Sequence, residues 1–280
     1  MSRPDPVLNL FKTQNFMPLL LPQSGIGPLQ LVGLFGNNLT PLGQLTTSMT
    51  TPPGTAPPPI IQDIATGASW EGQSSAQVKL SIGLQILGNI LQALTGQNLD
   101  VSTTYQNAKT MKFKFTDVSA DKIELNVLDQ YLGKANINPA GKQIEQMMLE
   151  SKVGILSMTL KAKKFVTSGQ NDSGTDIGVN VPVIQGVASG SLKVGFNNAQ
   201  NTEIAYEGTV PVTFAAQGVH LFFDDQGHYT AFDPFKAGQQ AVRGDQSRGR
   251  GISNFEPRML TIEGAFARWQ AADSVAKAVG

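Results

Sequence analysis

Few residues in this chain of 280 have the types and spacing that catalysis or metal binding requires. The two histidines, His220 and His228, have no second histidine at metal-ligand spacing, and His220 falls on the polar side of a predicted strand. Ser189 lacks the spacing of a nucleophile elbow. Asp224-Asp225 precedes a glycine, which is typical of a hairpin turn. We therefore expect no catalytic residue, no metal site and no cofactor, and a protein that is not an enzyme.

Cysteine is absent, which excludes disulfides, thiolate zinc sites and cysteine nucleophiles, and which fits a reducing cytosol. The formal net charge is +0, so there is no strong electrostatic footprint for nucleic acid. The start of the chain has no apolar signal core, and no apolar run reaches the length of a membrane-spanning helix. These features favour a protein that is cytoplasmic when it is made and that does not bind nucleic acid.

The composition indicates a β-rich fold. Charged residues make up 15% of the chain, well under the usual quarter, while 40% is hydrophobic. The polar surface must therefore consist largely of Thr, Ser, Asn, Gln and Gly, which suits strands better than helices. Segment 40–59 is rich in Thr and Pro and reads as an extended loop without regular structure.

Two long stretches alternate between apolar and polar residues, with the period of a β-strand. They span Thr104–Thr116 and Val153–Thr167. In the second, Val166 is expected on the apolar side, and lysines, threonines and serines form the other side of both stretches. The apolar positions on which the interpretation depends are Met111, Phe113 and Phe115 in the first stretch and Leu156, Met158 and Leu160 in the second.

Helical pieces are predicted near 126–134 and 139–150, between the two long strands. A strand to about Ile86 with a short helix to about Gly96 is predicted before them. Alternating segments after them predict further strands, three of them near 204–206, 210–214 and 219–223. The pattern predicts an α+β fold, in which a twisted, mixed but mainly antiparallel sheet carries inserted helices.

The two long amphipathic strands have two interpretations. A sheet that packs on one face and is wet on the other explains most such patterns. Alternatively, both stretches exceed the about 9–11 residues that a membrane-spanning strand needs. Strands in lipid must pair on both edges, so such segments would act only in a closed oligomeric barrel. Its apolar side would face lipid, and its Lys/Thr side would face a water-filled lumen.

The C-terminal part combines a loop that proteases can cut with an isolated amphipathic stretch. Segment 236–254 is polar, basic and broken by glycines, and it offers three candidate cleavage sites for a trypsin-like protease, Arg243, Arg248 and Arg250. From Lys236 onward, seven basic residues stand against four acidic ones, so the tail carries +3 and the rest of the chain −3. This segment predicts a removable tail.

The stretch after the loop has the spacing of one helical face. Leaving such large apolar side chains in water is unfavourable, so they must cover another surface. We expect a short helix that acts as an autoinhibitory latch on the sheet, although a C-terminal helix that merely completes the core has the same pattern. The stripe consists of Phe255, Met259, Ile262, Phe266 and Trp269.

Several motifs, taken in order over about residues 15 to 232, resemble those of the bacterial gasdermins. They are Asn15-Phe-Met-Pro-Leu-Leu-Leu-Pro22, Gly25-Ile-Gly-Pro-Leu-Gln30, Leu80-Ser-Ile-Gly-Leu-Gln-Ile-Leu-Gly88, Leu128-Asp-Gln-Tyr-Leu132, Val181-Pro-Val-Ile-Gln185 and Tyr206-Glu-Gly208.

The resemblance implies an autoinhibited pore-former of bacterial antiviral defence. It implies that a caspase-like or other protease removes the C-terminal peptide, and that the monomer then becomes a homo-oligomer. The oligomer would form a β-barrel in the lipid of the cell's inner membrane and cause cell death. The expected organisation is a pore-forming body at 1–235, a linker at 236–254 and an inhibitory segment at 255–280. Many members carry an acylated N-terminal cysteine, which this chain lacks.

Two other classes of protein fit parts of the pattern. A β-rich module that binds lipid or another ligand without catalysis would use the tail helix as core. An enzyme of unrecognised type would need a pocket of converging polar groups, which the sequence does not supply. Leakage of liposomes that depends on removal of the tail separates the pore-former from both.

Overall fold

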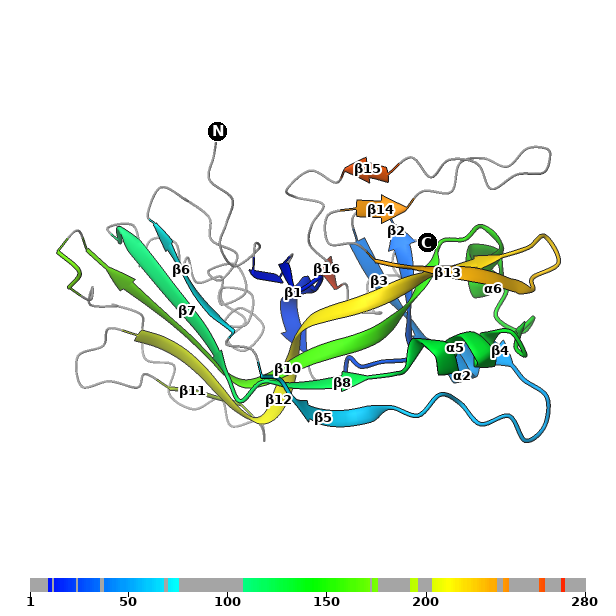
Figure 1. The fold of residues 1–280 in the computed structure, drawn as a ribbon, viewed down its shortest axis with the longest axis horizontal. Coiled ribbons are helices and arrows are strands. Elements are labelled where there is room, and N and C mark those ends of the chain that lie inside the picture. The colour runs from blue at the N-terminus through cyan, green and yellow to red at the C-terminus, as the bar shows by residue number, and fades with distance from the viewer. Residues whose placement is uncertain are drawn as a thin grey trace, which may run out of the picture.

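The structure, a computed structural model, describes residues 10–11, 13–23, 25–35, 38–67, 70–75, 108–171, 173–175, 192–195, 203–235, 239–241, 257–259 and 268–269. These residues form one long, curved sheet of 12 strands, with helices packed near one end (Figure 1). All pairings in this sheet are antiparallel except one, at its tail strand, so the predicted α+β fold on a mainly antiparallel sheet is confirmed.

The strands and helices follow one another along the chain in the order drawn in Figure 1. They are β1 (Met17–Gln23), β2 (Gln30–Phe35), β3 (Asn38–Gln44), α2 (Leu45–Ser48), β4 (Met49–Thr50), β5 (Ile61–Ala65), β6 (Glu71–Ser75), β7 (Thr110–Thr116), β8 (Ser119–Lys122), α5 (Leu125–Leu132), β9 (Asn136–Ile137), α6 (Lys142–Leu149), β10 (Val153–Gln170), β11 (Leu192–Gly195), β12 (Glu203–Phe223), β13 (Tyr229–Pro234), β14 (Gln239–Ala241), β15 (Pro257–Met259) and β16 (Arg268–Trp269).

The spine of the sheet is the antiparallel pair β10–β12. These strands have 18 and 21 residues and run side by side across the molecule (Figure 1). The three short strands predicted over 204–223 are therefore one continuous strand. Three register shifts between β10 and β12 explain the difference, because a bulge changes the face to which the next residue points without ending the strand.

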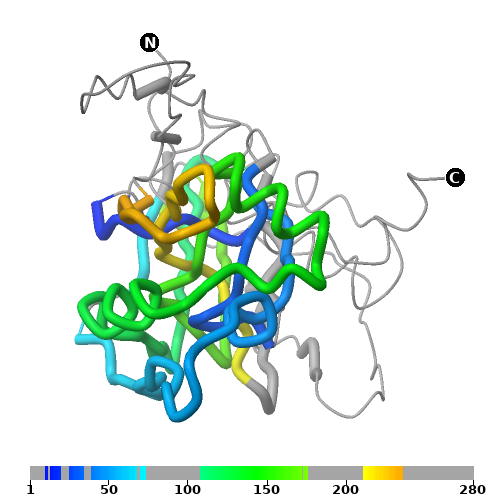
Figure 2. Tube along the Cα trace, turned by 90° about the vertical axis from the view of Figure 1, so that its right-hand side faces the viewer, coloured from blue at the N-terminus to red at the C-terminus, as the bar shows by residue number. Residues whose placement is uncertain are grey.

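Both predicted helices between the long strands are present, and they cover one face of the spine. α5 buries Leu128, Tyr131 and Leu132, which lie three and four residues apart on one side of a helix. α6 begins at Lys142 rather than near Pro139. The reason is a turn before it, in which the side-chain oxygen of Asn138 accepts a hydrogen bond from the backbone of Ala140. Figure 2 views the molecule from the end at which these helices lie.

The opposite face of the spine has its own core. Ile155 packs with the helices, whereas the next residue, Leu156, packs with Leu19, Val32 and Ala216 on the other side. Consecutive residues of a strand point to opposite faces, so the sheet is covered on both sides at this point. The first part of β10 is therefore buried on both faces.

The prediction of an unstructured loop over 40–59 is wrong for its first half. β3 pairs with β2, and α2 and β4 follow it. Pro41 argued against a strand in the sequence, because proline cannot donate a backbone hydrogen bond. In the structure it lies beside a register shift between β2 and β3, where a residue without an N–H is tolerated. The strand and helix predicted over 78–96 and the strand that starts near 177 lie outside the described residues.

Candidate functional site

The far end of the sheet consists of β6, β7, β10, β12 and β11, hydrogen-bonded in that order. In β7 the predicted alternation is present. Phe113 and Phe115 are buried and Met111 is half-buried, whereas Lys112 and Lys114 are exposed. β7 and β10 together carry five lysines and no carboxylate. β7 therefore has the two-faced character that the sequence predicts.

The wet face expected in the first half of β10 is wrong. Leu156 and Leu160 are fully buried and Met158 is half-buried, as expected of an apolar face, but Ser157 and Thr159 are buried too. The cause is tertiary, because strands and helices pack on both faces here. The hydroxyl of Thr159 is buried without a hydrogen-bond partner.

The second half of β10 is shifted by one face relative to the prediction. Phe165 and Thr167 point into the core, while Val166 lies with Lys164 and Ser168 on the outer side. The register shift between Ala162 and Lys164 causes this difference, since a bulge reverses the alternation that follows it.

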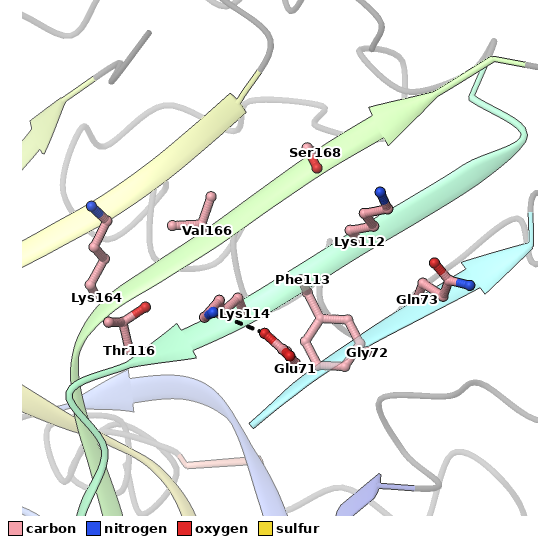
Figure 3. A pocket seen from close by; sticks show the side chains of 10 residues that line it. All are labelled: Glu71, Gly72, Gln73, Lys112, Phe113, Lys114, Thr116, Lys164, Val166 and Ser168. Atoms are coloured by element: carbon pink, nitrogen blue, oxygen red, sulfur yellow. Dashed lines mark ion pairs between the residues drawn. The ribbon is translucent and has the colours of Figure 1, made fainter. Parts of the chain in front are cut away.

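The outer side of this end of the sheet forms an open hollow of about 630 Å³ (Figure 3). Lysine side chains from β7 and β10 surround it, and Lys114 pairs with Glu71 of β6 at 3.0 Å. Phe113 lies over Gly72 on the neighbouring strand, where an added Cβ would come within 2.8 Å of the ring. A side chain at position 72 would therefore displace this ring.

Six aromatic rings fill the inner side of the same region. Phe115 stacks on Phe214, and Phe165 lies against Phe115 with a centroid distance of 4.5 Å. Phe11 and Trp70 complete the contacts to Phe214 at 5.9 and 6.1 Å, and Phe16 lies against Trp70. The apolar face of the candidate membrane strands is thus sealed by aromatic side chains from distant parts of the chain.

A cluster of charges fixes the bend of β10 at the point where its partner changes from β8 to β7. The Nζ of Lys161 lies 2.7 Å from Oδ1 of Asp121 on β8 and 3.0 Å from Oδ1 of Asp63 on β5. Burial lowers the pKa of Lys161, but the hydrogen bonds and negative charges of the two carboxylates together raise it above its ordinary value. The hydrogen bond and charge of Lys161 lower the pKa of Asp63. No local pattern in the sequence indicates this cluster, because its members are far apart in the chain.

The helix predicted for the tail is wrong at the positions that the structure describes. Pro257–Met259 pairs antiparallel with Gln239–Ala241, and Arg268–Trp269 pairs parallel with Asn38–Leu39 at the end of the sheet. An unpaired sheet edge offers backbone groups that a helix cannot satisfy, and this gain overrides a side-chain spacing that fits a helix. β15 and β16 therefore include Met259 and Trp269 of the predicted latch, whereas Phe255, Ile262 and Phe266 lie outside the described residues.

The last side chain described before the linker is Phe235, which follows β13. Its backbone N–H donates to the carbonyl of Gly218 at 2.7 Å, and its ring covers Gly154 and Gly218. An added Cβ at Gly218 would lie 2.6 Å from Cδ2 of this ring. The candidate cleavage sites Arg243, Arg248 and Arg250 lie outside the described residues.

The two histidines occupy different environments. His220 is buried, not on a polar face as expected, and its Nε2 donates a hydrogen bond to the carbonyl of Ser151. His228 sits beside the turn predicted at Asp224, whose carboxylate accepts backbone hydrogen bonds from Gln226 and His228. Within the described part of the chain, no three His, Asp or Glu side chains gather in a way that could hold a metal ion.

Comparison with known proteins places this sheet in a family. The model of the Bacterial Gasdermin Family matches residues 19–228. A gasdermin bGSDM from Desulfuromonadales bacterium is 33% identical over 264 residues, which cover 94% of this chain and 97% of that protein. A gasdermin bGSDM from Lysobacter enzymogenes is 29% identical over 86% of this chain and 90% of its own length.

The chain therefore belongs to the bacterial gasdermin family, as the resemblance in its motifs implied. The structure of a bacterial gasdermin from Bradyrhizobium tropiciagri shares the fold, with a TM-score of 0.54 at 12% identity, over 83% of this chain and 93% of that chain. Among the described residues, no helix is long and apolar enough to cross a membrane.

Proposed function

We propose that this protein is an autoinhibited pore-former that acts in antiphage defence. A protease of the host cell, caspase-like or trypsin-like, cuts the linker at 236–254, and the segment at 255–280 leaves the body at 1–235. The freed monomers assemble on the lipid of the inner membrane into a β-barrel, and the resulting pore kills the cell. Before cleavage the protein is a cytoplasmic monomer.

The observation that carries this proposal is the two-faced antiparallel pair β7–β10. One side presents lysines around an open hollow, and the other presents Phe113, Phe115 and Phe165. In a barrel the lysine side would line the lumen and the phenylalanine side would meet lipid. Membership in the gasdermins, a pore-forming family, supports the same assignment.

The tail supports the inhibitory half of the proposal. β16 adds to the edge of β3, and β15 pairs with β14, which precedes the candidate cleavage sites in the linker. A cut between β14 and β15 would separate these partners and leave the edge of β3 covered only by a segment that is no longer held covalently. Docking of the tail is then reversible, so membrane contact can compete with it.

The test is release of dye from vesicles of phosphatidylethanolamine and phosphatidylglycerol. The full chain carries a site for a sequence-specific protease in place of residues 245–250 and is added to the vesicles before the protease. We expect release only after cleavage. The matched control is the native chain with the same protease, which should remain intact and silent. A cleaved protein that binds vesicles without leakage would instead identify a lipid-binding module.

The native cleavage site is tested separately, with trypsin at limiting concentration. We expect cleavage at Arg243, Arg248 or Arg250, mapped by mass spectrometry of the new terminus. A triple change of these arginines to Gln should protect the linker and prevent leakage. Cleavage before Phe232 would contradict the proposed boundary, because it would remove part of β13 from the sheet.

A further inference from the structure

The outer edge of β12 is covered along its length by three short strands. β11 pairs with Ala205–Gly208, β1 pairs with Thr213–Ala216, and β13 pairs with Val219–Phe223. The inner edge of β12 belongs to β10. Of the three, only β11 covers the part of β12 that lies in the far end of the sheet, opposite β7 and β6 (Figure 1).

β11 is the fifth strand at this end of the sheet, and its direction decides how two copies of the chain could join. Neighbours in the order β6–β7–β10–β12–β11 are antiparallel throughout. β6 and β12 therefore run in opposite directions, whereas β6 and β11 run in the same direction. If copies of the chain join edge to edge, a unit that ends at β12 gives an antiparallel seam, and a unit that ends at β11 gives a parallel seam.

A barrel in lipid tolerates no free edge, and antiparallel seams between identical units require an even number of strands in each unit. Every backbone N–H and C=O in the hydrocarbon region must be paired within the closed sheet. Bacterial outer-membrane barrels of one chain have an even number of antiparallel strands. The unit β6–β7–β10–β12 meets both conditions when β6 of one copy pairs with β12 of the next. The unit that retains β11 does not.

We propose that β11 guards this edge: in the monomer it occupies the backbone of β12 to which β6 of a second copy binds in the assembled pore. The proposal rests on the proposed pore-forming function. It adds a step that differs from removal of the tail, because β11 lies at the far end of the sheet from β3 and β16.

The exchange conserves backbone hydrogen bonding. β11 offers the four residues Leu192–Gly195 to β12, and β6 offers the five residues Glu71–Ser75. Buried backbone groups must be paired in both states, and each strand provides a ladder of similar length. The edge therefore changes partner without leaving an unpaired stretch of β12.

The absence of cysteine makes the exchange directly testable, because two introduced cysteines can pair only with each other within the chain. Two adjacent register pairs between β11 and β12 are suitable, Lys193→Cys with Glu207→Cys and Val194→Cys with Tyr206→Cys. Antiparallel pairs alternate between the two hydrogen-bonding types, so one of the two variants is of the closer, non-hydrogen-bonded type, with a Cα separation that a disulfide spans.

The matched control locks two strands that stay neighbours in the proposed unit. Gln73→Cys with Lys112→Cys, and Ser75→Cys with Thr110→Cys, join β6 to β7. All variants are made in the full chain with the introduced protease site, oxidised, and cleaved in the presence of the phosphatidylethanolamine and phosphatidylglycerol vesicles. Dye release is then followed before and after a reducing agent is added.

We expect the β11–β12 disulfides to abolish release while oxidised and to restore it on reduction, and the β6–β7 disulfides to leave release unchanged. Release from the oxidised β11–β12 variants at the rate of their reduced forms would overturn the edge guard and leave the pore intact. Loss of release in the oxidised β6–β7 variants would overturn the proposed strand order. If the cleaved protein without cysteines releases no dye, the proposed function fails, and the edge guard fails with it.

Discussion

Phe115 of β7 and Phe214 of β12 stack with ring centroids 4.1 Å apart and planes 12° from parallel, although β10 lies between their strands. In a flat sheet, strands separated by one neighbour are about 9–10 Å apart. The rings can meet only because the sheet curls strongly at β10, so that its apolar face closes on itself. A barrel strand that presents this face to lipid would have to part the two rings.

The aromatic stack should stabilise the solution fold. Phe214 is fully buried, so Phe214→Ala should lower the free energy of unfolding by about 3–5 kcal/mol, as measured by urea denaturation of the full chain. Ile61→Ala is the control, since this side chain is 42% exposed and its truncation should cost about 0.5 kcal/mol or less. Equal effects of the two changes would contradict the assignment of Phe214 to the core.

The proposal that the phenylalanine side of β7 faces lipid can be tested at a position where the solution fold tolerates a change. Met111 is half-buried, so Met111→Lys should fold but should place a charge in lipid, at a cost of about 2–4 kcal/mol per subunit near the bilayer centre. Because many subunits share a barrel, release of dye after cleavage should fail. Thr116→Lys on the lysine side is the matched control and should retain release. Full release from both variants would show that Met111 does not meet lipid.

The charge cluster at the bend of β10 should depend more on Asp121 than on Asp63. The side chains of Lys161 and Asp121 are 15% and 11% exposed, whereas that of Asp63 is 72% exposed. Asp121→Asn should lower the free energy of unfolding by about 2–3 kcal/mol, because it leaves Lys161 with one solvated partner. This loss is smaller than that from removing one partner of a fully buried ion pair. Asp63→Asn should cost less, as exposed pairs do.

The same cluster predicts the direction of a pH dependence. The pKa of Asp63 in the folded protein is lowered by its hydrogen bond and charge interaction with Lys161. Its contribution is therefore present above its ordinary pKa and is lost as the pH falls through the folded value. The stability difference between the native chain and Asp63→Asn should shrink below the ordinary carboxyl pKa of 3.8. A difference that is constant down to strongly acidic pH would contradict the ion pair.

Thr159 offers a change that should stabilise the protein. Its hydroxyl is fully buried in β10 and has no hydrogen-bond partner. Burying such a group without a partner costs about 1–3 kcal/mol in proteins. Thr159→Val keeps the shape and removes the hydroxyl, so the midpoint of urea unfolding should rise, and Thr159→Ser should lower it through the lost methyl group. A lower midpoint for the valine variant would indicate a partner for the hydroxyl.

The latch is tested by weakening the tail without cutting it. Truncation of a buried Phe or Trp typically costs about 3–5 kcal/mol. Phe266→Ala combined with Trp269→Ala should therefore make the uncut chain leaky to vesicles and toxic on expression. Ala267→Ser, between them, is a conservative control that should remain silent. An uncut double variant that stays folded, monomeric and harmless, while cleavage still activates it, would assign the inhibition to other tail contacts.

Sequence periodicity predicted the elements whose surroundings are simple. β7 alternates cleanly because one face meets aromatic rings and the other meets water, and α5 has a single buried stripe. The same reasoning failed in β10, where Ser157 and Thr159 are buried by elements on both faces. It also failed after Ala162. A bulge there reverses the face of the sheet to which the following side chains point, and no local residue pattern marks a bulge.

The tail shows a second reason why secondary structure could not be predicted from local side-chain spacing alone. A spacing of three and four residues describes side chains, but Met259 and Trp269 lie in strands that are fixed by backbone pairing with Gln239 and Leu39. The partner edges are set by the rest of the fold, so the sequence of the tail cannot reveal them. The cluster of Asp63, Asp121 and Lys161 was hidden for the same reason.

The ring of Phe235 anchors the chain to the sheet directly after β13. It fills the space that Gly154 and Gly218 leave on two adjacent strands, and the backbone N–H of Phe235 donates to the carbonyl of Gly218. A pull on the chain beyond this residue is borne by the wedged ring and its hydrogen bond before it reaches β13. The residues at positions 154, 218 and 235 also depend on one another, because a side chain at either glycine would displace the ring of Phe235. We therefore expect the strands upstream of Phe235 to keep their register when the chain beyond it is pulled or removed.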